Sequence, residues 1–189
     1  MADKHFSTMC AAMFLAATIA LATTPYDRLV ERLKQARSIE CRAVTSSGER
    51  IRILAARGGK IRMESPQRTV VSNGSTVWNY VPSRKTVTVS SFVAGTAATF
   101  DRIAFELIEQ YRPETKSTEH VVLRPAAEML YGVRSIVLEF ADRTLRAITV
   151  EHTTGTERWT LRSVRYNPPT PSDAFEFTVP VGVEVIDMR

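Results

Sequence analysis

The first part of the chain has apolar residues at helical spacing. Between residues 24 and 37 they recur every three or four positions, as Leu29, Val30, Leu33 and Ala36. Thr24 is a good N-cap, Pro25 suits the first turn, and Asp27 stands where a capping-box partner is expected. The pattern therefore predicts one amphipathic helix over residues 24–37.

From about Ile39 onward, apolar residues alternate with polar ones, which is typical of strands. The expected strands cover residues 51–53, 61–64, 70–71, 77–81, 86–93, 120–124, 134–140, 145–152 and 157–166, followed by a closing segment with Phe175 and Phe177 that ends near Ile186. Turn sequences separate several of them, namely Gly58-Gly59, Ser72-Asn73-Gly74-Ser75 and Thr153-Thr154-Gly155-Thr156. Because such short turns join neighbouring strands as hairpins, an antiparallel sheet is expected.

A second helical pattern interrupts the strands between residues 97 and 111. Its apolar stripe consists of Phe100, Ile103, Leu107 and Ile108, whereas Phe105 lies off the stripe. Arg112-Pro113 is expected to end this helix. With so many consecutive strands and only two helices, the fold class is mainly β, as a strongly curved sheet or partial barrel.

The N-terminus has the features of a secretory signal peptide. Residues 9–22 contain no charge and close with Ala20-Leu21-Ala22, a small-x-small cleavage pattern. This run is shorter than the roughly 20 apolar residues that span a membrane. We therefore expect a signal peptide over residues 1–22 and a single domain over residues 23–189, exported to the periplasm. An uncleaved membrane anchor stays open as an alternative, while Cys10 precedes the apolar run in a poor lipobox context.

Composition and charge exclude some classes of protein. The chain has a formal net charge of +5, but its arginines are spread along the alternating strands rather than clustered in a run. We interpret them as a solvated outer face and expect no nucleic-acid partner. Cys41 is the one cysteine outside the signal region, so no disulfide within the mature chain is expected, and a buried, unreactive thiol is the simplest interpretation.

No arrangement typical of catalysis or metal binding occurs in the sequence. The histidines are His5, His120 and His152, and none has a partner at ligand spacing or a recognisable nucleophile nearby. We expect a binding protein with no catalytic residue, no metal and no cofactor, built around an apolar cavity. A secreted hydrolase that uses His120 or His152 is the alternative from another class.

Two stretches, taken in order, resemble the LolA family of lipoprotein carriers. The first reads Arg62-Met63-Glu64-Ser65-Pro66 and then Val70 to Tyr80, with Pro82 after it. The second contains Asn167-Pro168-Pro169, Phe175, Phe177, Pro180, Gly182-Val183 and Val185-Ile186-Asp187. Together with the signal and the first helix, the resemblance covers most of the mature chain.

This resemblance implies a half-open antiparallel β-barrel with an N-terminal helix and a helical lid across its mouth. Family members collect acylated lipoproteins from an inner-membrane ABC transporter, shield the acyl chains, and pass the cargo to an outer-membrane acceptor where one exists. The resemblance also implies that the protein is a monomer and has no cofactor. The superfamily also contains RseB-like proteins, so a lipid- or lipoprotein-sensing regulator on the same fold is the alternative function.

The resemblance also implies roles for individual residues. Arg57 matches a basic residue that holds the closed lid through hydrogen bonds to the lid helix. Ile61 and Met63 match bulky positions that line the cavity, and we assign Trp78 of the first motif to the same cavity. On the second helix, the underside of the lid is expected to consist of Phe100, Ile103 and Leu107.

Overall fold

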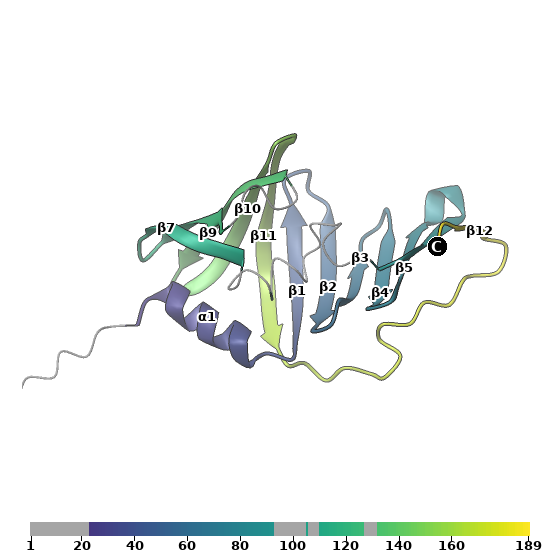
Figure 1. Cartoon of the computed structure of the whole chain (residues 1–189), viewed down its shortest axis with the longest axis horizontal. Helices are drawn as coiled ribbons and strands as arrows, with labels where there is room; N and C mark the ends of the chain where they lie inside the picture. The colour runs from purple at the N-terminus through teal and green to yellow at the C-terminus, as the bar shows by residue number, and fades with distance from the viewer. Residues whose placement is uncertain (1–22, 93–104, 106–109, 127–131) are drawn as a thin grey trace, which may run out of the picture.

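A computed structural model describes residues 23–92, 105, 110–126 and 132–189 of the chain, and Figure 1 shows their arrangement. The helix α1 spans Pro25–Gln35 and a short 3-10 helix, η1, spans Pro82–Arg84. The strands are β1 (Ser38–Thr45), β2 (Arg50–Ala56), β3 (Lys60–Glu64), β4 (Thr69–Asn73), β5 (Thr76–Val81), β6 (Thr86–Ser91), β7 (Tyr111–Lys116), β8 (His120–Pro125), β9 (Val133–Ala141), β10 (Thr144–His152), β11 (Gly155–Tyr166) and β12 (Glu184–Asp187).

All of these strands belong to one sheet that is not closed into a barrel. Their order is β12-β6-β5-β4-β3-β2-β1-β11-β10-β9-β8-β7, so β12 and β7 lie at the two edges. Neighbours pair in antiparallel fashion, except that β12 runs parallel to β6. The prediction of a mainly β, half-open antiparallel barrel is thereby confirmed, together with its three hairpin turns and its N-terminal helix.

The sheet has an inner face on which α1 packs and an outer face. Because directly opposed residues share a face, the register assigns Ile39, Ala55 and Ile61 to the same side. These residues join Leu29 and Leu33 of α1 in one buried apolar cluster. The inner face therefore carries the main core, and α1 crosses the sheet in front of the end of β11 (Figure 1).

Local sequence explains how α1 begins and how it is attached. The Thr24 hydroxyl accepts a hydrogen bond from the Asp27 amide at 3.2 Å, and the Asp27 carboxylate accepts one from the Thr24 amide at 3.1 Å. This is the capping box that the sequence predicts. Asp27 also binds the Lys116 ammonium at 2.5 Å, which ties α1 to the edge strand β7.

Stability is expected to depend on the ionisation of Asp27. The hydrogen bond from Lys116, and then that from Thr24, lower the pKa of Asp27 from 3.8 to about 2. A lowered pKa in the folded state stabilises the fold above the unfolded pKa, and this contribution is lost as pH falls from about 4 towards 2. Urea denaturation of wild type and Asp27→Asn should show a difference at pH 7 that vanishes near pH 2. A difference that persisted at pH 2 would show that the carboxylate charge is not its cause.

Two predictions about the sheet are wrong in detail. Tyr111 begins β7 instead of ending a helix, and β7 was not predicted because Arg112-Pro113 indicates a helix stop and the strand has few apolar residues. Edge strands tolerate proline and charge, since one of their sides needs no hydrogen bonds. The closing segment with Phe175 and Phe177 is not a strand, and regular pairing resumes only at β12.

Other predictions concern residues outside the described ranges. The signal peptide falls on residues 1–22, and the lid residues Phe100, Ile103 and Leu107 fall within residues 93–104 and 106–109. They remain predictions. Neither helix in the described part of the chain has the length and apolar character needed to cross a membrane.

Candidate functional site

Strand β2 presents a row of apolar residues along the inner face. Ile51, Ile53 and Ala55 are 8%, 0% and 0% exposed, and all belong to the main buried cluster. Ile53 pairs with Met63 and Ala55 with Ile61 on β3, so these β3 residues extend the row sideways. Two residues predicted to line a cavity, Ile61 and Met63, are thus adjacent on one apolar surface. Ile61 is buried, and Met63 packs partly exposed against the cluster.

Arg57 lies at the end of this row, in the turn between β2 and β3. Its Nε donates to the Ala36 carbonyl at 3.0 Å, and one Nη donates to the Leu33 and Lys34 carbonyls, both at 3.1 Å. These carbonyls belong to the C-terminal turn of α1, which has no other helical donors for them. Arg57 therefore caps the C-terminus of α1, and its positive charge lies at the negative end of the helix dipole.

The same guanidinium contacts the segment predicted to form the lid. Its central carbon lies 5.1 Å from the centroid of the Phe105 ring, within the range of a cation–π interaction. Phe105 is 9% exposed and belongs to the inner-face cluster with Ile61. Arg57 thus bridges α1 and Phe105. Phe105 lies off the apolar stripe of the predicted helix, so its burial did not follow from the sequence pattern.

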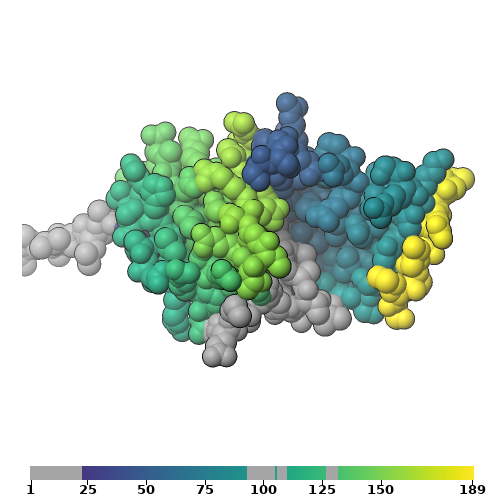
Figure 2. Space-filling view, turned by 90° about the horizontal axis from the view of Figure 1, so that it is seen from above, coloured from purple at the N-terminus to yellow at the C-terminus, as the bar shows by residue number. Residues whose placement is uncertain are grey.

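A cavity of about 580 Å³ opens at the other end of the row. It lies where β1, β2 and β3 approach the hairpin between β1 and β2, and Ala43 and Ile51 line it. Both residues belong to the buried cluster, but most of the lining is polar. Arg42, Arg52 and Glu64 pair with one another on the outer face, so the cavity opens mainly on the face opposite the apolar row. Figure 2 looks at the molecule from above, with the green strands on one side, the blue-green strands on the other, and the yellow C-terminal residues at the outer edge of the blue-green strands. A volume of 300–1,000 Å³ is typical of ligand sites.

Trp78 does not share the surface of Ile61 and Met63. Its partners in the ladder are Val71 on β4 and Val89 on β6, and Val71 itself pairs with Arg62. Since neighbouring residues of a strand point to opposite faces, Arg62 and Trp78 lie on the outer face. The three predicted cavity residues are therefore divided between the two faces of the sheet.

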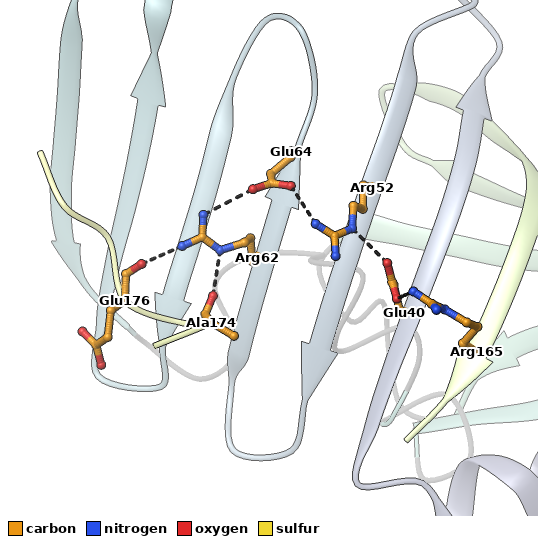
Figure 3. A network of polar contacts seen from close by, with 7 residues as sticks. All are labelled: Glu40, Arg52, Arg62, Glu64, Arg165, Ala174 and Glu176. Atoms are coloured by element: carbon orange, nitrogen blue, oxygen red, sulfur yellow. Dashed lines mark hydrogen bonds and ion pairs between the residues drawn. The ribbon is translucent and has the colours of Figure 1, made fainter. Parts of the chain in front are cut away.

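The outer face carries a network of charged side chains, shown in Figure 3. Glu40, 4% exposed, accepts hydrogen bonds from Arg52 at 2.9 Å and from Arg165. The bond from Arg52, and secondarily that from Arg165, keeps the pKa of Glu40 below its usual value despite burial. Arg52 and Arg62 both contact Glu64 at 3.3 Å. The network joins β11, β1, β2 and β3.

Arg62 also fastens the segment that follows β11. Its Nε and Nη2 donate to the Ala174 and Glu176 carbonyls at 2.7 and 2.6 Å. Phe175, between these two carbonyls, is 8% exposed, and Phe177 stacks near Tyr80 with ring centroids 5.8 Å apart. Residues 167–183 thus form an outer strap over β3 to β5, with charged contacts and aromatic contacts on the face opposite the apolar row (Figures 1 and 3).

The remaining reactive side chains are not grouped into a common site. Burial, and then the charge of Glu40, raises the pKa of the Cys41 thiol to about 12, so it stays protonated and unreactive. His120 pairs with Glu139, whereas His152 pairs with Val133 at the other end of β9. Across the described ranges, no three His, Cys, Asp or Glu side chains come together to hold a metal ion.

Comparison with known proteins identifies a family. The sequence model of the family described as "Outer membrane lipoprotein carrier protein LolA" matches residues 43–178 of this chain. This span includes the apolar row of β2, Arg57, the outer network except Glu40, and most of the outer strap. A search of curated proteins finds no match.

Solved structures resemble this chain at low sequence identity, and the one from Thermus thermophilus shares its fold. An uncharacterized conserved protein from Thermus thermophilus is 13% identical, with a TM-score of 0.52, and the match covers 86% of this chain and 98% of that one. A candidate outer membrane lipoprotein-sorting protein domain from Vibrio parahaemolyticus is 12% identical over 80% of this chain and 94% of that one, with a TM-score of 0.41. The Mycobacterium tuberculosis lipoprotein LppX is 9% identical over 78% and 95%, with a TM-score of 0.33.

Proposed function

The chain belongs to the LolA family of outer membrane lipoprotein carrier proteins, and from this premise we propose that it is a periplasmic carrier for the acyl chains of lipoproteins. It takes acylated lipoproteins from an inner-membrane ABC transporter and passes them to an outer-membrane acceptor. The observation that carries this proposal is the continuous apolar surface of the inner face, where the row Ile51, Ile53 and Ala55 lies beside Ile61 and Met63. Acyl chains lie along this row, with Ile61 and Met63 beside them.

The physical task is to keep hydrocarbon away from water during transfer. Each buried CH₂ group contributes about 0.8 kcal/mol, so the chains of one lipoprotein represent tens of kcal/mol if exposed. The apolar row of the inner face offers the matching surface. The carrier itself needs neither metal nor nucleotide, because cargo moves between two apolar sites according to their relative affinities.

Arg57 and Phe105 are the proposed closing device. In the empty protein Phe105 covers the apolar row, and Arg57 holds α1 and Phe105 together. Incoming chains replace Phe105 on the row and the cation–π contact is lost. Closing therefore weakens the apparent affinity for acyl chains. The binding free energy is reduced by the free energy of the closing contacts, which is about 1 kcal/mol for each hydrogen bond or cation–π pair. A modest latch of this kind allows release to a better acceptor.

The proposal is tested by native mass spectrometry of the protein purified after export of the full chain into a periplasm. We expect a bound species with the mass of an acylated lipoprotein. In Arg57→Leu the bound fraction should increase, because the closed state loses its latch while the apolar row is unchanged. The exposed Arg84→Leu, in η1 at the far end of the sheet, is the control that removes the same charge.

Each outcome has a clear meaning. Bound lipoprotein with a higher fraction in Arg57→Leu supports both the carrier and the latch. Bound phospholipid or fatty acid without lipoprotein indicates a lipid-binding protein on this fold and contradicts the carrier role. A protein that stays empty and takes up no lipoprotein from solubilised membranes contradicts the proposal altogether.

A further inference from the structure

A second cavity, of about 130 Å³, lies between α1 and the adjoining ends of β10 and β11. It is separated from the apolar row by β1, since the strand order is β2-β1-β11-β10. The described residues that line it include no acidic side chain but five arginines, namely Arg28, Arg32, Arg143, Arg146 and Arg162. This concentration of one charge is not explained by the carrier function.

Two of these arginines stand at irregularities of the sheet. In the pairing of β10 with β9, Leu145 and Ala147 lie opposite two consecutive residues of β9, so Arg146 between them is an extra residue. In the pairing of β11 with β1, Leu161 and Ser163 lie opposite two consecutive residues of β1, so Arg162 between them is an extra residue. A β-bulge changes the direction of the side chain at the extra residue. Two adjacent strands thus each place a bulged arginine at the same cavity.

The other arginines approach from the helix and from the turn before β10. Arg28 and Arg32 are one turn apart on α1 and so lie on one helical face. Arg28 and Arg143 donate to the same acceptor, the Thr23 carbonyl, at 3.5 and 3.4 Å. Their guanidinium groups therefore converge at one point of the rim.

The positive charges of this cluster are poorly compensated. Arg146 has Asp142 at 3.8 Å, but the Asp142 side chain is 92% exposed. Among the described residues, no carboxylate oxygen lies within 4.0 Å of a guanidinium nitrogen of Arg28, Arg32, Arg143 or Arg162. Like charges held around one cavity repel one another, and a bound anion removes that repulsion.

Beneath this basic rim the cavity has an apolar floor. The floor contains Leu29, Phe140 and Leu161, which are 7%, 6% and 6% exposed. At about 30 Å³ for each water molecule, the volume holds about four waters, which suits a head group and not a whole lipid. A fitting occupant therefore combines a compact anion with a small apolar portion.

We propose that this cavity binds the phosphate group of a phosphorylated amphiphile. Guanidinium groups match phosphate oxygens in bidentate fashion, and the floor accepts the carbons next to the phosphate. The site is separate from the proposed acyl-chain site, because none of its five arginines belongs to the apolar row or to the latch. Arg162 also borders the 580 Å³ cavity, whose lining is mainly on the outer face. The same phosphate chemistry occurs in lipid head groups and in soluble phosphate esters, and the choice of probes separates these two sources.

The test measures phosphate binding by the exported protein and by two matched double variants. Arg146→Gln with Arg162→Gln removes both bulged arginines, and Arg68→Gln with Arg84→Gln removes two exposed turn arginines away from the cavity. Calorimetry with inorganic phosphate and glycerol 3-phosphate tests soluble esters. Sedimentation with phosphatidylcholine vesicles, with and without phosphatidylglycerol, tests head groups.

We expect wild type and the turn double variant to bind at least one phosphate probe, and the bulge double variant to bind it on the order of a hundredfold more weakly. Binding should weaken with added salt. Binding of a soluble probe identifies free phosphate esters as ligands, whereas binding only to phosphatidylglycerol vesicles identifies a lipid head group, and both support the site. Absence of binding to every probe, or an equal loss in both double variants, would overturn it.

Discussion

Met63→Glu is expected to weaken the binding of an acylated lipoprotein on the order of a hundredfold. Met63 lies on the inner face, partly exposed beside Ile53 of the apolar row. An acyl chain placed there would leave the new carboxylate without water and without a cation, which costs several kcal/mol. Because Met63 is not fully buried, the substitution should leave the fold intact. Competition with a fluorescent fatty acid, together with a thermal melt of each protein, provides the measurement.

Trp78→Glu is the matched control for this experiment. Trp78 is also partly exposed in the same half of the sheet, but the register places it on the outer face. We expect its affinity for acyl chains to equal that of wild type. The opposite result, with affinity lost in Trp78→Glu and kept in Met63→Glu, would move the acyl-chain site to the outer face and contradict the proposed route along β2.

The largest effect on stability is expected from Gly74→Ala, with a loss of about 2–4 kcal/mol in the free energy of unfolding. Gly74 has φ = +93° in the turn between β4 and β5. A Cβ atom there would lie 2.3 Å from the Gly58 carbonyl oxygen. Backbone strain and this contact act together, and the oxygen belongs to the neighbouring turn, which cannot move without disturbing Arg57. Urea denaturation measures the change.

Gly48→Ala separates the two contributions. Gly48 has a similar φ of +83° in the turn between β1 and β2, but nothing lies within 4 Å of an added Cβ. Only backbone strain remains, so we expect a loss of about 1 kcal/mol. Equal losses in the two variants would mean that the approach of the two turns has no energetic consequence.

Much of the fold follows from local features of the sequence. The hairpins at Gly58-Gly59 and at Asn73-Gly74 depend on residues that adopt positive φ, and both glycine positions do so. The start of α1 follows from Thr24 and Asp27 in the same way. These features act over a few residues, which is why a sequence pattern can predict them.

Other features depend on partners that are distant in the sequence. β12 pairs with β6 in parallel because residues 167–183 cross the outer face, and no local pattern indicates that route. Val77 pairs with Ser72, and Ser72 pairs with Ile61, so Val77 lies on the inner face. Its neighbour Trp78 therefore lies on the outer face. A shift of one residue along a strand reverses the face, so membership in a motif did not determine the side.

The candidate site also combines features that the sequence predicts with features that depend on distant partners. The apolar character of Ile61 and Met63 was evident, and both lie on the inner face. The partners of Arg57 are now seen to be the α1 carbonyls and Phe105, whereas a helical stripe alone had favoured Phe100, Ile103 and Leu107, which lie outside the described residues. The convergence of five arginines depends on two bulges, and nothing in an alternating pattern reveals where a strand gains one residue.

The parallel edge strand also determines the order in which this sheet can be completed. Glu184 of β12 pairs with Thr86 of β6 across 184 − 86 = 98 positions of sequence. Ile39 of β1 and Tyr166 of β11 form the other distant pairing, 166 − 39 = 127 positions apart, whereas most other neighbours are joined by short turns. Closing so long a loop costs more chain entropy than forming a hairpin, so both pairings form late. Until then β6 is a bare edge, able to accept a strand from another chain. The outer strap that ends in β12 therefore protects this edge, and its pairing with β6 removes a surface through which two copies of the chain could join.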